Sequence, residues 1–188
     1  MRRAACLGML MLFLAAPAPA REIAGVAVPE TVDLPGAPLV LNGAGVRKKF
    51  FVKVYVGALY LPKPEGRGEA ILDAPGSKSV RMHFLYEEVE ARKLVDGWNE
   101  GFAANQTEAE LQGLQPRLDR FNALFRTVRK GETIWLDYLP PEGTQVWIAG
   151  ELKGSIPGAD FNRALLKVWL GEKPADAGLK KAMLGGLD

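Results

Sequence analysis

Alternating hydrophobic and polar residues predict β-strands in the first half of the chain and again near residue 140. The early strands are expected over 23–28, from Leu39 to Leu41, over 50–61 and over 78–86. Residues 68–74 between them form one turn of helix or a loop. Two later strands, 132–139 and 144–150, flank the turn "PPEG" and predict a hairpin, to which residues 151–156 add a third strand.

Between these groups of strands the hydrophobic period changes to that of a helix. Over 89–106, one helix face carries Leu94, Val95, Trp98, Phe102 and Asn105 at spacings of three, four and seven. A second helix is expected to begin at Thr107, because Thr107 and Glu110 have the spacing of a capping box. Pro116 either breaks this helix or starts another, whose apolar stripe is Leu118, Phe121, Phe125 and Val128, before Gly131 stops it.

The chain is expected to end in two more helices. The first covers 159–170, with Asp160 as a candidate N-cap and Gly171 just past its end. The second is short and covers 176–184. Because strands come in runs instead of alternating with helices, we predict an α+β fold with a mainly antiparallel sheet and helices over one face.

The expected strand 50–61 has two unlike faces. Strict alternation places Val52, Val54, Val56 and Ala58 on one face, suited to a core. The other face is mixed aromatic and polar and follows a basic corner; its residues are Phe51, Lys53, Tyr55 and Leu59, behind Arg47, Lys48 and Lys49. This mixed face is either a solvated edge or the lining of a cleft.

Residues 1–20 have the pattern of a secretory signal peptide. Arg2 and Arg3 precede an apolar run over 4–16, and Ala18-Pro19-Ala20 forms a small-residue cleavage site. The alternative is a short membrane anchor, but the run is too short to span a bilayer. We therefore expect an exported protein, periplasmic or released to the medium with the periplasm favoured, whose single domain is 21–188 and has no membrane span.

Removal of this segment takes away the only cysteine and leaves equal numbers of basic and acidic residues. A neutral domain lacks the electrostatic footprint of nucleic-acid binding. The single histidine, His83, makes a zinc site very unfavourable, and "NGAGVRKK" lacks the spacing of either nucleotide fingerprint. We expect no metal and no cofactor, and a monomer.

Three segments resemble the chalcone isomerase family. "GAGVRKKFFVKVYVGALYL" is similar to the family's strand with its Gly-Ala-Gly, arginine and Tyr-Leu end. "WNEGFAAN" resembles the helix with an aromatic residue and an asparagine seven apart, and "LLKVWLGEKPADAGLKKAML" resembles the C-terminal helix. The resemblance covers about 23–184 and implies an open-faced sandwich, a large antiparallel sheet with a layer of helices. Bacterial exported members are the most similar group.

The resemblance also implies a cleft between helices and sheet, with site residues at family positions. The family arginine corresponds to Arg47 and its helix asparagine to Asn105. At three further positions the polar residue has changed: a strand threonine corresponds to Tyr55, a helix tyrosine to Trp98 and a C-terminal threonine to Val168, followed by Trp169. Because tryptophan cannot accept a hydrogen bond and valine cannot form one, the substitutions weigh against efficient chalcone cyclisation.

The predicted ligand-binding residues are Arg47, Lys53, Tyr55, Trp98, Asn105, Val168 and Trp169. In this hypothesis Arg47 holds an anionic end of the ligand. Six of these residues also have a plainer interpretation: Arg47 and Lys53 as solvated cations, Tyr55 as a buried ring whose hydroxyl bonds a neighbouring loop, Asn105 as a helix-terminal residue, and the tryptophans as core.

Three functions remain open from the sequence. The first is a non-catalytic binder of a small lipophilic molecule, such as a fatty acid or aromatic acid. The second is an isomerase of the chalcone isomerase type on an enone or phenolic substrate, in which Arg47 and Tyr55 would be catalytic. The third is a structural or protein-partner module whose cleft is closed by side chains.

Overall fold

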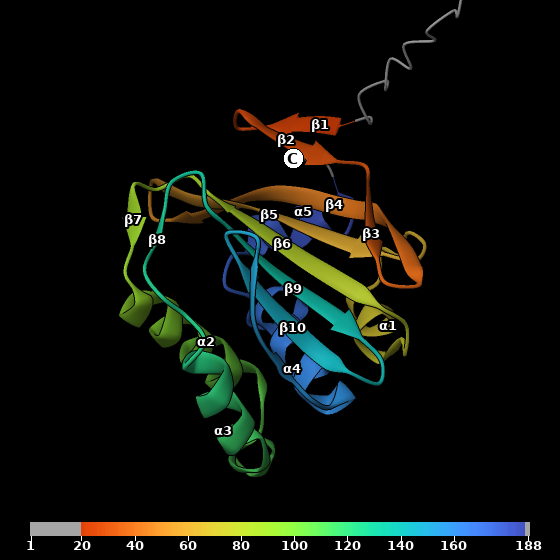
Figure 1. The fold of residues 1–188 in the computed structure, drawn as a ribbon, viewed down its shortest axis with the longest axis vertical. Helices are drawn as coiled ribbons and strands as arrows, with labels where there is room; N and C mark the ends of the chain where they lie inside the picture. The colour runs from red at the N-terminus through yellow and green to blue at the C-terminus, as the bar shows by residue number, and fades with distance from the viewer. Residues whose placement is uncertain (1–19, 187–188) are drawn as a thin grey trace, which may run out of the picture.

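The structure is a computed structural model that describes residues 20–186. The expected signal peptide, 1–20, therefore lies outside the described residues except for Ala20. Figure 1 shows a large curled sheet with helices against one face and a small N-terminal hairpin near the other. The strands are β1 (Ala20–Ile23), β2 (Val26–Pro29), β3 (Thr31–Leu34), β4 (Ala37–Lys49), β5 (Val52–Leu61), β6 (Lys78–Phe84), β7 (Glu88–Val89), β8 (Val128–Arg129), β9 (Thr133–Leu139), β10 (Gly143–Ile148) and β11 (Glu151–Ile156).

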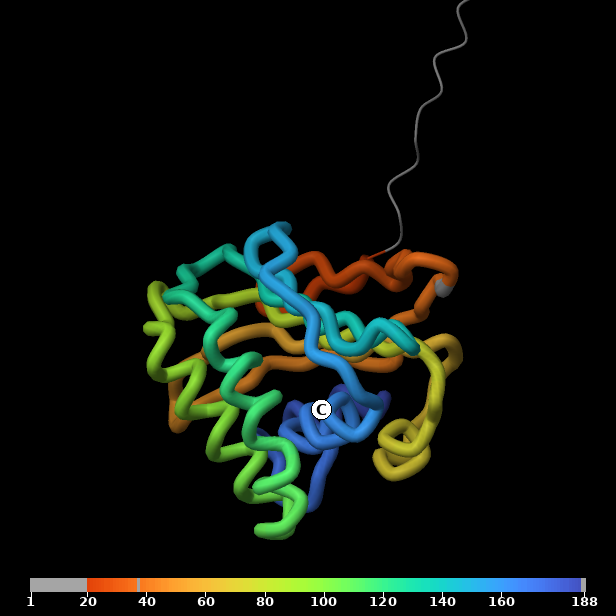
Figure 2. The backbone as a smooth tube through the Cα atoms, turned by 60° about the horizontal axis from the view of Figure 1, so that its bottom comes forward, coloured from red at the N-terminus to blue at the C-terminus, as the bar shows by residue number. Residues whose placement is uncertain are grey.

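The helices lie in three places along the chain. They are α1 (Gly68–Asp73), α2 (Ala91–Asn105), α3 (Glu108–Asn122), α4 (Ala159–Leu170) and α5 (Ala177–Met183). The main sheet has the strand order β11-β10-β9-β6-β5-β4-β3, and every adjacent pair in it is antiparallel. Figure 2 shows the helices below this sheet and the red N-terminal hairpin above it. The predicted α+β class, with helices over one face, is confirmed.

Two segments differ from the expected strands because a tight turn divides each of them. The expected strand 50–61 contains the turn Phe50-Phe51 at its start, and this turn joins β4 and β5 into a hairpin. Residues 23–28 likewise contain the turn between β1 and β2, where Ala24 and Gly25 both have positive φ. Pattern alone missed these turns because neither carries the usual Asn-Gly or Asp-Gly signal.

A β-bulge in β5 makes the predicted alternation wrong at the start of this strand. Arg47 pairs with Tyr55, but the next residue, Lys48, pairs with Lys53, so that Val54 has no partner on β4. The extra residue reverses the side-chain parity. Val52 and Val54 therefore share a side of the sheet with Tyr55, instead of with Val56.

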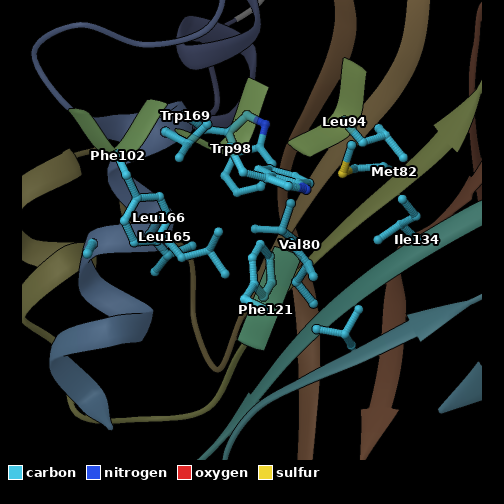
Figure 3. Close-up of a cluster of buried hydrophobic side chains, with 14 of the residues drawn as sticks. Val80, Met82, Leu94, Trp98, Phe102, Phe121, Ile134, Leu165, Leu166 and Trp169 are labelled. Atoms are coloured by element: carbon cyan, nitrogen blue, oxygen red, sulfur yellow. The ribbon is translucent and has the colours of Figure 1, made fainter. Parts of the chain in front are cut away.

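The main core lies between the sheet and the helices. Its centre is aromatic: Trp98 of α2 is 5.6 Å from Trp169 of α4 and 5.5 Å from Phe121 of α3, centroid to centroid. Figure 3 shows Trp98 between Trp169 and the sheet residue Met82. Full burial of each such side chain stabilises the fold by about 1.5–3 kcal/mol. The predicted stripe Leu94, Trp98 and Phe102 is the buried face of α2.

A second, smaller core covers the opposite side of the sheet. Val26 and Val28 of β2 and Val32 and Leu34 of β3 are buried there. They pack against outward-facing residues of β4 and β5, including Leu39, Val56 and Tyr60. The outward face of β5 is thus a core face, although the residues that cover it come from β2 and β3 and not from a helix.

Helix α5 packs directly against the Gly-Ala-Gly segment of β4. A Cβ at Gly43 would lie 2.0 Å from the backbone oxygen of Ala182, and one at Gly45 would lie 2.6 Å from the Ala182 Cβ. Any larger residue would push the helix off the strand. These glycines therefore serve close packing, in agreement with the missing nucleotide-loop spacing.

The helix ends confirm one predicted cap and correct two predictions. Thr107 and Glu110 form the capping box at α3, which continues through Pro116 and ends at Asn122, before Gly131. Asp160 is not the N-cap of α4; Gly158 takes that position. Asp160 instead lies in the first turn, where the Arg117 guanidinium donates to it at 2.7 and 2.6 Å. No helix in the part of the chain that the structure describes is long and apolar enough to cross a membrane.

Candidate functional site

A cavity of about 430 Å³ opens between the sheet and α2. This volume is in the range of small-molecule sites. Its walls come from the β4–β5 hairpin, from β6 and β7, from α2 and from the end of α4. The lining residues include Arg47, Val52, Val54, Tyr55, Met82, Phe84, Leu94, Trp98 and Val168.

The inner wall of the cavity is apolar. Met82 and Phe84 of β6 and Leu94 of α2 are buried and form the same core as Trp98. Phe84 is the register partner of Tyr55 across β5 and β6, and their ring centroids are 5.7 Å apart. Such a wall accepts a hydrocarbon or an aromatic ring, because contact removes apolar surface from water.

Arg47 lies at the polar end of the cavity with an unused hydrogen-bond donor. Its side chain is half-buried, and its Nε atom is buried without a hydrogen-bond partner. The guanidinium carbon is 5.6 Å from the ring centroid of Tyr55, its register partner on β5. No described residue forms an ion pair with Arg47. A buried donor without a partner is destabilising, so a ligand acceptor here would be favoured.

Tyr55 is held in place by Trp169. The indole Nε1 of Trp169 donates a hydrogen bond of 2.9 Å to the Tyr55 hydroxyl, and both side chains are buried. Burial raises the pKa of Tyr55, and the positive charge of Arg47 only partly opposes this. The hydroxyl is therefore protonated at neutral pH, and no residue that the structure describes accepts its hydrogen.

Trp98 supplies a third donor. Its ring packs edge-to-face on Trp169, and its Nε1 is buried without a partner. Arg47, Tyr55 and Trp98 all line the cavity, and each offers an N–H or O–H group. The set has donors and one fixed positive charge. It is complementary to a carboxylate, an enolate or a carbonyl oxygen attached to an apolar body.

The structure brings four of the predicted site residues to the cavity wall and leaves three off it. Arg47, Tyr55, Trp98 and Val168 line the cavity. Trp169 is buried behind Tyr55. Lys53 is exposed, because the bulge at Val54 turns it away from the cavity.

Asn105 is a structural clamp outside the cavity. Its side-chain amide donates to Gly101 O at 3.0 Å and to Lys173 O at 2.9 Å, and its oxygen accepts from Lys173 N at 3.0 Å. The two bonds with Lys173 join the end of α2 to the loop after α4, and the bond to Gly101 stays within α2. The plainer interpretation of Asn105, a helix-end residue, describes its place.

Sequence reasoning missed most of the apolar lining. The signal for Leu94 was present, because it lies four residues before Trp98 on the same helix face. Met82 and Phe84 could be placed at the cavity only by knowing that β6 is the neighbour of β5. Val52 and Val54 could be placed there only by knowing of the bulge, which has no sequence signature.

The family model described as chalcone isomerase-like matches residues 20–185. The chain belongs to the chalcone isomerase-like family. The match covers almost every residue that the structure describes, including all elements that form the cavity.

The fold of this chalcone isomerase-like protein is also found in solved structures. One is the crystal structure of a fatty-acid binding protein from Arabidopsis thaliana, with a TM-score of 0.68 and 18% sequence identity. The match covers 85% of this chain and 92% of the plant protein. At this identity the likeness shows the fold. No curated protein gives a significant match to the chalcone isomerase-like chain.

Proposed function

We propose that this chalcone isomerase-like protein is an exported, non-catalytic binder of a lipophilic carboxylate such as a fatty acid. The carboxylate would lie against Arg47, Tyr55 and Trp98, and the hydrocarbon would lie along Met82, Phe84 and Leu94. The single observation that carries the proposal is the unpartnered Arg47 Nε beside an open, mainly apolar cavity. The fatty-acid binding protein with the same fold supports it.

An isomerase is the alternative that shares this cavity. General base catalysis is most efficient when the pKa of the base lies near the working pH. Burial raises the pKa of Tyr55 further above neutral pH, which makes it a poorer general base. Its oxygen also already accepts a hydrogen bond from Trp169. Trp98 and Val168 cannot take up a proton. The donor set supports binding better than proton transfer.

A closed structural module is supported less than either. That hypothesis requires Trp98 and Trp169 to fill the cleft. The two rings do pack together, but a cavity of about 430 Å³ remains beside Trp98.

The test compares binding of dodecanoate, measured by calorimetry, in wild type, Arg47→Lys and Arg47→Ala. Charge-assisted hydrogen bonds contribute about 1.5–3 kcal/mol, which corresponds to roughly ten- to more than a hundredfold in affinity. We expect the order wild type, then Arg47→Lys, then Arg47→Ala, because lysine keeps the charge and loses the two-pronged geometry.

Two controls test whether the change in dodecanoate affinity is specific to the charge of Arg47. Lys48→Ala removes a neighbouring exposed cation that does not line the cavity, and should change dodecanoate affinity little. Dodecanol has the same chain without the charge, so Arg47→Ala should weaken its binding much less. Equal dodecanoate affinity in wild type and Arg47→Ala, with unchanged thermal unfolding, would refute the proposal.

A further inference from the structure

The most exposed large hydrophobic side chains gather at the mouth of the cavity. Phe51 is 100% exposed, Phe50 89%, Tyr86 47% and Val52 44%. Phe50, Val52 and Tyr86 line the cavity, and Phe51 adjoins them in the same turn. In the described residues the one other such side chain is Leu152, on β11. An exposed apolar cluster of this kind marks an interaction surface.

The turn that presents the two phenylalanines has an unfavourable backbone. Phe50 has a φ of 57°, a value that two-residue hairpin turns usually assign to Gly, Asn or Asp. Bulky residues avoid this region. The turn therefore combines backbone strain with fully exposed aromatic rings, and neither feature helps the isolated fold. Strain retained at such a place is typical of a functional segment.

Cations surround this turn. Lys48, Lys49 and Lys53 are exposed, and none forms an ion pair with a described residue. On the opposite wall of the mouth, the carboxylates of Glu88 and Asp96 face Arg129 at 3.1 Å and Arg92 at 3.8 Å. Glu100 is the one carboxylate of the lining without such a pair. The hairpin side of the mouth is thus apolar at its tip and positively charged around it.

We infer that this mouth, formed by Phe50, Phe51, Val52 and Tyr86 with the three lysines, docks the protein on an anionic phospholipid bilayer. Phenylalanine rings insert below the headgroups, and lysines beside them bind lipid phosphates, which is the pattern of interfacial membrane elements. In this orientation the mouth of the cavity faces the bilayer. A lipophilic acid then passes between bilayer and cavity without crossing water, and this last step rests on the proposed function.

The experiment measures sedimentation of the chain from Arg21 with phosphatidylcholine vesicles, with and without phosphatidylglycerol. All described elements remain in this chain except one residue of β1. We expect binding to the anionic vesicles that weakens with added salt. Phe51→Ser should lower the partition coefficient about tenfold, and Lys53→Gln about fivefold.

The matched controls use residues far from the mouth. Leu152→Ser removes the other exposed hydrophobic side chain, and Lys63→Gln removes an exposed cation beyond the opposite end of β5. Neither should change the partition. Equal loss in Phe51→Ser and Leu152→Ser, or no binding of wild type to anionic vesicles, would overturn the docking.

Failure of docking and failure of ligand binding give different results. Phe51 and Lys53 do not line the cavity, so their variants test docking while dodecanoate affinity is measured separately in solution. Dodecanoate binding without vesicle binding overturns only the docking; vesicle binding without dodecanoate binding supports docking and overturns the proposed ligand. A dimer that forms without vesicles and disappears in Phe51→Ser would assign the turn to self-association instead.

Discussion

The Tyr55 hydroxyl bonds the protein through its oxygen and faces the cavity. Its oxygen accepts the Trp169 hydrogen bond, and its hydrogen is available to a ligand. At the scale of single residues, this hydrogen bond fixes the orientation of a buried hydroxyl and leaves its hydrogen free to be donated. Arg47 differs, since its charge is permanent and its position follows from register pairing with Tyr55.

Exchange of Tyr55 should affect both stability and binding. Tyr55→Phe leaves the Trp169 N–H without an acceptor, and should lower the free energy of unfolding by about 1–2 kcal/mol and dodecanoate affinity about fivefold. Trp169→Phe also destabilises but keeps the hydroxyl in the cavity, so affinity should stay within about twofold. Denaturant unfolding and calorimetry measure both. Equal loss of affinity in the two variants would show that Tyr55 acts through packing alone.

Lys78 should give the protein a pH-dependent stability. Its ammonium group is buried, donates to Ala74 O and Gly76 O, and has a pKa lowered by burial to about 8. Between pH 8 and the ordinary lysine pKa near 10.5, the unfolded chain binds more protons than the folded one, so stability rises with pH. The rise should be about 2 kcal/mol by pH 10.

Urea unfolding between pH 7 and pH 10 tests this linkage. Lys78→Met has no titrating group there and should lose the rise. Burial raises the pKa of Tyr60 to about 12. The stability that Tyr60 contributes is therefore lost only as the pH increases beyond 10, and this loss does not mask the rise due to Lys78. A wild-type curve that is flat from pH 7 to 10 would contradict the assignment.

At the scale of elements, the cavity depends on how α2 and α4 are joined. Gly101 of α2 faces Val168 of α4 so closely that a Cβ would lie 2.8 Å from the valine side chain. Asn105 then ties the end of α2 to the loop that follows α4. Together these contacts place Trp98 and Val168 at one wall.

Asn105→Ala tests the clamp. It removes three hydrogen bonds and should lower the free energy of unfolding by about 2 kcal/mol, since each is worth about 0.5–1.5 kcal/mol. Dodecanoate affinity should stay within about twofold, because Asn105 is outside the cavity. The control is Asn99→Ala on the same helix, which loses one exposed bond from Asn122 and should cost under about 0.5 kcal/mol. A large loss of affinity without destabilisation would return Asn105 to the binding site.

At the scale of the whole molecule, the described elements begin at the last residue of the expected signal peptide. The strands and helices run from Ala20 to Met183, and Ala20 contributes only the first pair of β1 with β2. Cleavage after Ala20 would therefore leave both cores intact.

Export should be visible in the mass of the purified protein. Expressed at full length in a Gram-negative host, the chain should be recovered from the periplasmic fraction with the intact mass of 21–188. Ala20→Arg replaces the small residue at the cleavage site and should leave the precursor uncut. Recovery of unprocessed wild-type chain from the cytosol would contradict export.

Local pattern determined the fold class, the buried stripe of α2, the capping box of α3 and the β9–β10 hairpin. These features depend on residues close together in the chain, where periodicity and capping chemistry act directly. The family resemblance added Arg47, Tyr55, Trp98 and Val168, all of which line the cavity.

Only the tertiary structure decided the rest. The bulge at Val54 depends on pairing between β4 and β5, and it brings Val52 and Val54 to the cavity while turning Lys53 to solvent. The role of Asn105 depends on a loop 68 residues away. Whether the cleft is open depends on how three helices pack on the sheet. The bulge lies within a hairpin, but it follows from the pairing register of two strands and not from the residue pattern of either one. The Asn105 bonds and the helix packing are long-range contacts, and the free energy that selects them is shared among residues that no local pattern connects.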